Sequence, residues 1–206
     1  AALKRLDHVQ ALLDLVKAFE MVDHCELAQA AKKHGFSLKV LRLSLAAYRI
    51  ARSIGIEEVY STTVTANRGI TAGSGFATTE LRVLLTDLLF DLRKLWPTSL
   101  KLYVDDLTIA AKGEPAKVAS ILSQATEFAV TSFTRLGLEV SKSKSNAIAS
   151  SGALCRTVVI KTHTKALRPA KQTKLLGVGI AGGKRRAIHV QSKRLDAFAS
   201  KIGRIQ

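Results

Sequence analysis

Residues 100–111 read LKLYVDDLTIAA, in which Asp105 and Asp106 lie between two stretches rich in apolar and β-branched residues. Such stretches are typical of strands, and adjacent aspartates are typical of the turn that joins two strands. The segment therefore predicts a β-hairpin with the two aspartates at its turn. Nearer the N-terminus, residues 9–15 read VQALLDL, which predicts a buried strand carrying one acid, Asp14.

Three carboxylates thus lie in otherwise apolar surroundings, where an ionised carboxylate is costly unless it is paired, protonated or bound to a cation. If the hairpin lies beside the strand that bears Asp14, the three acids form a site for two divalent ions. Mg²⁺ suits such a site because it binds few carboxylates together with water and substrate phosphate. Two ions activate an attacking hydroxyl and stabilise a leaving pyrophosphate. The alternative is that Asp105 and Asp106 form an ordinary polar turn and Asp14 caps the next helix.

Helical and strand-like patterns alternate along the rest of the chain. Apolar residues at helical spacing predict helices over residues 18–34, 38 to about 55, 81–95 and 115 to about 136. Residues 57–65 predict a strand or one arm of a hairpin. Shorter strand-like pieces lie at residues 138–140, 146–150, 156–162 and 174–180, and a basic amphipathic terminus follows. Residues 68–79, RGITAGSGFATT, hold three glycines and predict a loop whose backbone approaches something closely. This order indicates an α+β fold, an antiparallel sheet with helices packed on one face.

The positive charge of the chain is concentrated near its C-terminus. The 206 residues carry a net charge of +16, and residues 141–206 hold 15 basic side chains and one acidic one. A field of this strength suits a polyphosphate partner, because each neutralised phosphate releases counterions. The alternative is a basic tail that binds nucleic acid or ribosomes without specificity. A domain boundary, if there is one, is expected near residues 150–151, where the acids cease.

Several classes of protein are excluded. With 47% hydrophobic residues the chain can bury a core, and it has no apolar run long enough for a membrane span and no secretory signal pattern. Two cysteines, Cys25 and Cys155, provide neither a disulfide scaffold nor a zinc motif, so we expect an intracellular protein, nuclear or cytoplasmic. The glycines of residues 177–182 match a dinucleotide-binding spacing but precede a basic turn, and no P-loop or histidine ligand spacing is present.

Five segments resemble motifs of reverse transcriptases, in the same order along the chain. Residues 13–27, LDLVKAFEMVDHCEL, resemble the motif in which an Asp ends a strand and an Ala-Phe pair follows. Residues 102–111, LYVDDLTIAA, resemble the Tyr-x-Asp-Asp hairpin, and residues 68–78 stand where the family has its Gly-x-Pro-Gln-Gly loop. Residues 136–148, LGLEVSKSKSNAI, are similar to the Gly-Leu strand with a downstream Lys, and residues 174–180, KLLGVGI, to the Leu-Gly motif after the palm.

The resemblance is closest to polymerases of non-LTR retroelements, and it implies a truncated or divergent member of the family. The implied fold is a right-hand polymerase palm in residues 1–150, with fingers and thumb largely absent. Residues 151–206 would form a basic segment that continues the palm and contacts nucleic acid. The implied activity is RNA-directed DNA polymerisation, a two-metal nucleotidyl transfer onto a primer 3′-hydroxyl. It implies two Mg²⁺ ions, replaceable by Mn²⁺, an RNA template, a DNA primer, deoxynucleoside triphosphates and no evident protein partner.

The resemblance also implies roles for individual residues. Asp14 and Asp105 would hold both metal ions, Asp106 would support the site, and Lys144 would assist the departure of pyrophosphate. Phe19 would lie under the incoming sugar and exclude a 2′-hydroxyl by its bulk. The other residues implied to bind substrate are Leu15, Ala72, Gly73 and Tyr103. The residues implied to bind nucleic acid are Lys174, Gly177, Lys184, Arg185, Arg186 and Arg194.

The glycine-rich loop departs from the family pattern. Thr71, Ala72 and Gly73 stand where the family has Pro-Gln-Gly, so the Gln amide that helps to hold nucleotide and template is missing. Two hypotheses of different class follow: an RNA-directed DNA polymerase, or a catalytically inactive module that binds RNA or an RNA–DNA duplex. A viral RNA-templated RNA polymerase is a third, which the bulk of Phe19 disfavours.

Overall fold

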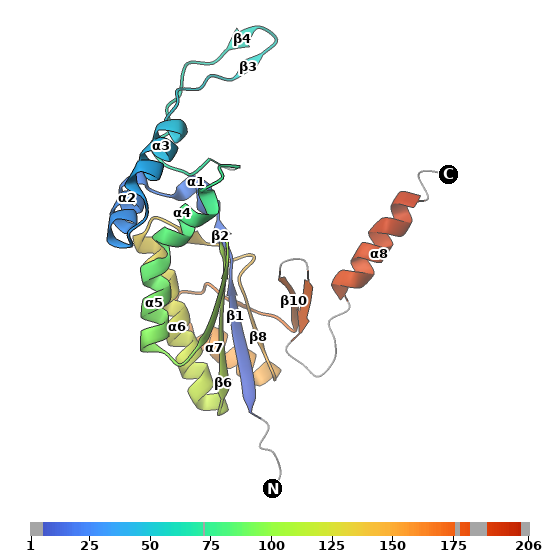
Figure 1. Ribbon diagram of the computed structural model, residues 1–206. Coiled ribbons are helices and arrows are strands. Elements are labelled where there is room, and N and C mark those ends of the chain that lie inside the picture. The colour runs from blue at the N-terminus through green and yellow to red at the C-terminus, as the bar shows by residue number, and fades with distance from the viewer. Residues whose placement is uncertain (1–5, 72, 176–177, 182–188, 203–206) are drawn as a thin grey trace.

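A computed structural model describes residues 6–71, 73–175, 178–181 and 189–202 of the chain. Its centre is a five-stranded sheet with helices on one face (Figure 1), as the sequence predicted for an α+β fold. All neighbouring strands are antiparallel except the last pair, which is parallel. The strands, in spatial order, are β5 (Ser99–Tyr103), β6 (Asp106–Gly113), β1 (Asp7–Leu13), β8 (Asn146–Ala149) and β9 (Arg168–Pro169).

The strand β1 lies in the middle of this sheet because its sequence is apolar along most of its length. Its second half, from Ala11 to Leu13, is buried, and it pairs with β6 on one side and β8 on the other. In the register with β6, Leu13 lies opposite Leu107. The predicted buried strand and the predicted hairpin are therefore neighbours.

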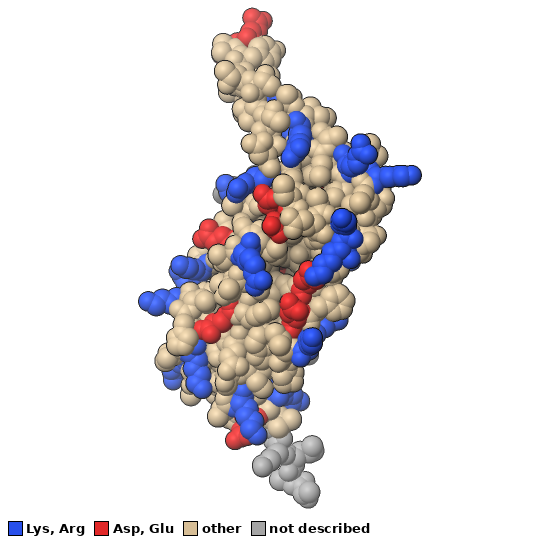
Figure 2. Space-filling view, turned by 90° about the vertical axis from the view of Figure 1, so that its left-hand side faces the viewer, with Lys and Arg blue, Asp and Glu red and all other residues tan. Residues whose placement is uncertain are grey.

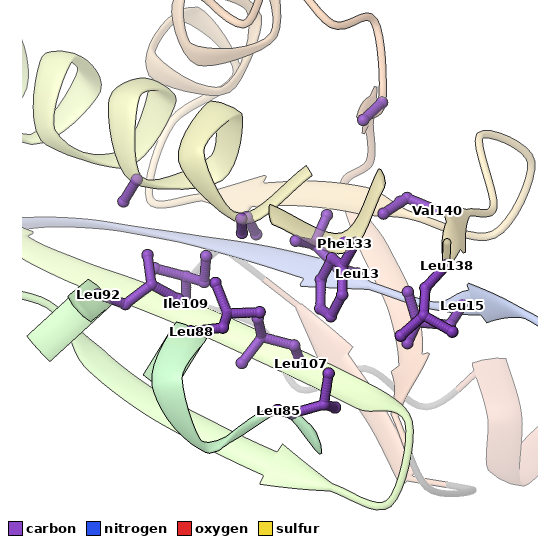
Figure 3. Close-up of a cluster of buried hydrophobic side chains, with 14 of the residues drawn as sticks. Leu13, Leu15, Leu85, Leu88, Leu92, Leu107, Ile109, Phe133, Leu138 and Val140 are labelled. Carbon is purple, nitrogen blue, oxygen red and sulfur yellow. The ribbon is translucent and has the colours of Figure 1, made fainter. Parts of the chain in front are cut away.

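Three helices cover one face of the sheet: α5 (Thr86–Leu95), α6 (Pro115–Arg135) and α7 (Gly152–Lys161). Phe133 of α6 is fully buried and lies close to Leu13 of β1 (Figure 3). Leu88 and Leu92 of α5, on the same face of the sheet, approach Ile109 of β6 and belong to the same cluster. Burial of these side chains stabilises the sheet by roughly 1.5–3 kcal/mol each.

Two of the predicted helices are divided. The first is split into α1 (Ala18–Met21) and α2 (His24–Lys33), because Asp23 begins a new helix by accepting hydrogen bonds from the Cys25 and Glu26 amides at 2.7 and 3.1 Å. These two bonds hold the pKa of the Asp23 carboxyl below its usual value. The third predicted helix begins earlier than expected and is split at Leu85 into α4 (Ala77–Leu84) and α5.

A small hairpin projects from the upper end of the molecule. The helix α3 (Leu38–Tyr48) ends well before residue 55, where its end was predicted. The hairpin consists of β3 (Gly55–Ile56) and β4 (Val59–Tyr60), joined by two residues with positive φ, Glu57 (46°) and Glu58 (69°). Of the two alternatives for residues 57–65, a strand or one arm of a hairpin, the structure has the hairpin arm, which is the short strand β4 because the turn takes up Glu57 and Glu58.

The structure also corrects the strand prediction for residues 156–162, because residues 156–161 are helical. The Ser151 hydroxyl accepts a hydrogen bond from the Leu154 amide at 3.2 Å and so begins α7. Leu154, Cys155 and Val158 lie on the buried face of α7, which packs on α6 and β8. This packing outweighs the strand preference of the β-branched residues.

The remaining elements are short. Strand β2 (Leu15–Val16) pairs with β7 (Glu139–Val140), and β10 (Gln172–Leu175) pairs with β11 (Val178–Ala181), where the sequence predicted one strand over residues 174–180. Helix α8 (His189–Ile202) comes last. In the part of the chain that the structure describes, no helix is long and apolar enough to cross a membrane.

Candidate functional site

Asp14 lies where strand β1 ends and before β2 begins. Its backbone is fixed from both sides: its amide donates to the Ser145 hydroxyl at 3.0 Å, and its carbonyl accepts from the Ser141 amide at 2.8 Å. The side chain is 27% exposed, and among the described residues its buried Oδ1 has no hydrogen-bond partner. The carboxylate therefore retains an oxygen with unused acceptor capacity.

Lys144 supplies a positive charge next to this oxygen. Its Nζ lies 3.4 Å from Asp14 Oδ1. The lysine is part of a turn that follows β7, in which the Ser145 amide donates to the Ser141 carbonyl at 2.9 Å. Because the same turn bonds to the Asp14 backbone, Lys144 and Asp14 are held together by the fold as well as by their charges.

The turn between β5 and β6 brings the other two aspartates to the same end of the sheet. Tyr103 pairs with Asp106, which leaves Val104 and Asp105 as the two turn residues. Val104 has a φ of 58°, which is unusual for a β-branched residue and costs about 1–3 kcal/mol. Leu13 lies opposite Leu107 in the antiparallel register, so Asp14, which follows Leu13, and Asp106, which precedes Leu107, lie at the same end of the sheet as this turn.

The three carboxylates affect one another. Burial raises the pKa of the Asp106 carboxyl above its usual value of 3.8, and the negative charges of Asp105 and then Asp14 raise it further, while the Lys144 ammonium opposes them. Like charges in a partly buried place are relieved by a bound cation. The unused acceptor on Asp14 and this mutual repulsion both fit a divalent cation.

A complete protein-only metal centre is not formed, however. Across residues 6–71, 73–175, 178–181 and 189–202, no three His, Cys, Asp or Glu residues are grouped closely enough to hold a metal ion. Mg²⁺ usually binds through one or two carboxylates and takes its remaining ligands from water and substrate phosphate. The donor set therefore fits an ion that completes its ligands from water and a substrate phosphate better than a resident structural metal.

Phe19 lies in α1, directly after the aspartate segment, and it is linked to the glycine-rich loop. The Phe19 carbonyl accepts from the Ile70 amide at 2.8 Å, and the Val22 carbonyl accepts from the Gly69 amide at 2.7 Å. Gly69 has a φ of 95°, and a Cβ there would lie 3.0 Å from the Glu20 carbonyl oxygen. Only glycine allows the loop to approach α1 so closely.

The other residues expected to bind substrate differ in exposure. Tyr103 is 60% exposed at the end of β5, and Gly73 lies in the loop with a φ of 90°. The Leu15 side chain is only 3% exposed and belongs to the core, so a contact with substrate would have to be made by its backbone. Ala72 lies outside the described residues.

Few of the residues expected to bind nucleic acid fall in the described part of the chain. Lys174 lies in β10, and Arg194 is exposed on α8. The remaining four, Gly177, Lys184, Arg185 and Arg186, lie outside the described residues. The predicted nucleic-acid contacts of these residues stay predictions.

Sequence reasoning did not identify the residues that fasten the site. The buried Ser145 holds the Asp14 amide, and the buried ring of His24 donates from Nε2 to the Gly69 carbonyl at 2.8 Å. Ser145 lies in a serine- and lysine-rich stretch without a distinguishing pattern. For His24 a signal existed, because a His-x-x-Leu spacing follows Phe19 within the first reverse transcriptase motif.

Comparison with known proteins agrees with the geometry. The family described as reverse transcriptase (RNA-dependent DNA polymerase) matches residues 2–180. Among solved structures, the chain resembles apo telomerase from Candida tropicalis, truncated from its C-terminal domain, with a TM-score of 0.58 and 12% identity over 85% of this chain and 34% of that one. It also resembles C. tropicalis telomerase in complex with a fragment of telomeric RNA, with a TM-score of 0.56 and 10% identity over 86% of this chain and 29% of that one.

The chain thus spans about a third of the length of these telomerase structures, and at such low identity they show a shared fold only. No curated protein matches the chain in sequence. The family match, by contrast, covers most of the 206 residues and includes all five motifs. The α+β sheet with its aspartate hairpin is a reverse transcriptase palm-like domain, and the chain belongs to the reverse transcriptase (RNA-dependent DNA polymerase) family.

Proposed function

We propose that this protein catalyses RNA-directed DNA polymerisation. In this reaction the primer 3′-oxygen attacks the α-phosphorus of a deoxynucleoside triphosphate, the bond between the α- and β-phosphates breaks, and pyrophosphate leaves. The observation that carries the proposal is the meeting of Asp14 with the Asp105–Asp106 turn at one end of the sheet. Membership of the reverse transcriptase family supports the same reaction.

Asp14 and Asp105 hold the divalent ions, Mg²⁺ or Mn²⁺, and Asp106 supports them. When bound, such ions lower the pKa of the attacking hydroxyl and neutralise charge on the leaving pyrophosphate. The unused Oδ1 acceptor of Asp14 and the repulsion at Asp106 support this assignment. In the chain without ions, the Lys144 ammonium partly balances the negative charge of the three carboxylates.

Other residues bind and select the nucleotide. Phe19 restricts the space at the sugar 2′-position, which favours deoxynucleotides, and its tie to Ile70 sets it beside the glycine-rich loop. Lys144 is close enough to the carboxylates to donate hydrogen bonds to the departing pyrophosphate. The exposed Tyr103 and the backbone at Gly73 and Leu15 complete the substrate contacts, with Ala72 between Thr71 and Gly73 in the loop.

Primer extension tests this function directly. The protein is incubated with an RNA template, a labelled DNA primer and Mg²⁺, with either deoxynucleotides or ribonucleotides. We expect extension with deoxynucleotides only, and we expect Phe19→Ala to admit ribonucleotides because the bulk at the 2′-position is removed. A wild-type protein that extends no primer at any Mg²⁺ or Mn²⁺ concentration would contradict the proposal.

A second candidate is a catalytically inactive module that binds RNA or an RNA–DNA duplex. It is favoured by the altered Thr71–Gly73 sequence and by the absence of a three-ligand metal group among the described residues. Both candidates need the basic side chains of residues 141–206 to contact phosphates. They differ in whether the carboxylates are required, because only a polymerase has an activity that is lost when Asp14 or Asp105 is replaced.

The salt dependence of binding tests these basic side chains. If six to eight of these cations face one duplex, log K falls against log salt with a slope of about −5 to −7. Replacing Lys184, Arg185, Arg186 and Arg194 by Ala flattens the slope by about three to four units. The matched control replaces Lys4, Arg5, Lys32 and Lys33, and an equal loss in both sets would contradict a dedicated C-terminal contact.

The residues in the five motifs resemble those of non-LTR retroelement polymerases, which supports an origin in such an element. The two free cysteines, the exposed Cys25 and the buried Cys155, suit the reducing interior of a cell, nuclear or cytoplasmic.

A further inference from the structure

Glu80 is a fully buried acid in α4, on the same face of the helix as the buried Leu81 and Leu84. Within the described residues no cation forms an ion pair with it, and its Oε1 has no hydrogen-bond partner. Its Oε2 accepts from the Tyr48 hydroxyl at 2.7 Å. A well-packed apolar residue at this position would usually make the protein at least as stable. The presence of the acid is therefore best explained by the hydrogen bond that it accepts from Tyr48.

Tyr48 connects Glu80 to the glycine-rich loop. Its hydroxyl lies 2.9 Å from the Ser74 Oγ as well as 2.7 Å from Glu80. A carboxylate can only accept, so the single phenol proton goes to Glu80 and the Ser74 hydroxyl donates to Tyr48. Burial, and donation to Glu80, raise the pKa of the Tyr48 hydroxyl, which therefore stays protonated at neutral pH.

Besides the backbone bonds of Gly69 and Ile70 described above, three side chains fasten the loop in the part of the chain that the structure describes. His24 binds the Gly69 carbonyl, Arg52 Nη2 donates to Thr71 Oγ1 at 3.4 Å, and Ser74 binds Tyr48. Ser74 Oγ also accepts from the Phe76 amide at 3.4 Å, so the serine fixes the chain where the loop enters α4. Of these three attachments, that of Ser74 leads to a buried acid.

This attachment has a consequence for a polymerase whose loop has lost the Gln side chain of the family. Ala72 provides no side-chain amide at that position, so contacts there fall to the loop backbone, and backbone contacts require a fixed loop. A pocket of about 260 Å³ lies beside the loop. It is lined by Glu20, Tyr48, Arg52, Arg68 and Thr71 among others.

We propose that Glu80 is a positioning residue that, through Tyr48 and Ser74, holds the glycine-rich loop in the conformation that contacts the nucleotide. The inference rests on the proposed polymerase function for its kinetic consequence. The hydrogen-bond chain itself is independent of catalysis. Its test therefore has one readout on the loop and one on the reaction.

Amide hydrogen exchange, followed by mass spectrometry of peptides that cover residues 69–76, reports on the loop. Tyr48→Phe and Ser74→Ala each remove one hydroxyl and keep the side-chain packing, and we expect exchange in these peptides to rise about tenfold. The matched control is Tyr60→Phe, because Tyr60 is exposed on β4 and its hydroxyl makes no hydrogen bond within the described residues. It should leave the loop unchanged.

Kinetics then separate positioning from simple stabilisation. Glu80→Leu combined with Tyr48→Phe removes both partners of the buried hydrogen bond, so we expect an unchanged or higher Tm together with a KM for deoxynucleotide raised about fivefold to tenfold and a kcat within about twofold of wild type. Glu80→Gln keeps an acceptor for Tyr48 and should restore most of the KM. A structural role alone would lower Tm and leave KM in place.

The outcomes are distinguishable. Loop exchange that stays at the wild-type level in Tyr48→Phe, in Ser74→Ala and in Glu80→Leu combined with Tyr48→Phe would overturn the proposal, as would faster exchange spread evenly over α3 and α4. Faster loop exchange in a protein that extends no primer would support the positioning role and contradict the polymerase function.

Discussion

Two hairpins of this molecule are alike in outline and different in surroundings. Each is closed by a two-residue turn with a non-glycine residue at positive φ, and each carries two neighbouring acids. Asp105 lies in the turn between β5 and β6 and Asp106 begins β6, whereas Glu57 and Glu58 form the turn between β3 and β4. The first lies against β1 in the central sheet, whereas the second projects from the body (Figure 1). Figure 2 shows the second with acidic atoms at its tip and uncharged surface along its length.

The difference lies in what surrounds each pair of acids. Asp106 is partly buried, and the charges of Asp14 and Lys144 act on its carboxyl. Both of these residues come from segments far away in the sequence. The other hairpin exposes Ile56, Val59 and its two glutamates to solvent. The two acids of the first hairpin therefore belong to a cluster of charges, because the end of β1 adds a third acid and the turn after β7 adds a cation.

The largest expected contrast between the hairpins is catalytic. We expect Asp105→Asn to lower primer extension by about 10³-fold or more while nucleic-acid affinity stays the same or rises slightly, because a metal ligand and one negative charge are lost. The control, Glu57→Gln combined with Glu58→Gln, should stay within about twofold of wild type. Single-turnover extension and filter binding measure the two effects, and equal losses in both variants would remove the distinction between the hairpins.

The next contrast concerns stability. Leu107 of β6 is 1% exposed and Val59 of β4 is 73% exposed. We expect Leu107→Ala to lower the free energy of unfolding by about 2–5 kcal/mol, because it leaves a cavity beneath the aspartate turn. Val59→Ala should change it by less than about 0.5 kcal/mol. Urea titration followed by circular dichroism gives both values, and a large loss in Val59→Ala would show that the projecting hairpin is packed in solution.

The smallest expected effect is on the pH dependence of Tm. Because the pKa of Asp106 is raised in the folded protein, the folded state holds this proton more tightly, and stability falls as the pH rises from 3.8 through the raised value. This loss of stability is complete at pH 7, so Asp106→Asn should raise Tm at pH 7. Below the ordinary pKa of 3.8 the substitution should not raise Tm. Scanning calorimetry with EDTA present measures this, and Glu58→Gln serves as the control. A Tm for Asp106→Asn that is lower than wild type at pH 7 would contradict crowding of the carboxylates.

The sequence predicted the elements whose signals are local. The aspartate hairpin and the long helix α6 between Pro115 and Gly137 were predicted because turn residues and a terminal proline mark them. The helix α7 was missed because Thr157, Val158 and Val159 favour a strand, and only packing on α6 decides otherwise. The break at Asp23 could have been predicted, since Glu26 three residues later completes a capping pattern.

The site was predictable to a similar extent. Asp14, Asp105 and Lys144 were predicted as site residues from the motifs, which stays a prediction, and the structure adds a direct ion pair between Asp14 and Lys144. The network of Glu80, Tyr48 and Ser74 was not predicted, because residues 26 and 32 positions apart meet only after α3 and α4 have packed. An acid at an apolar position of a helix was the available signal.

If Asp14 and Asp105 together hold the divalent cation, Mn²⁺ bound in the presence of primer, RNA template and a deoxynucleotide should be visible by electron paramagnetic resonance in the wild-type protein. We expect the affinity for Mn²⁺, measured from this signal, to fall by at least about tenfold in Asp14→Asn and in Asp105→Asn, since each removes one carboxylate ligand. It should persist in Glu57→Gln combined with Glu58→Gln. A bound Mn²⁺ signal of unchanged affinity in Asp14→Asn and Asp105→Asn would contradict a metal site between β1 and the aspartate hairpin.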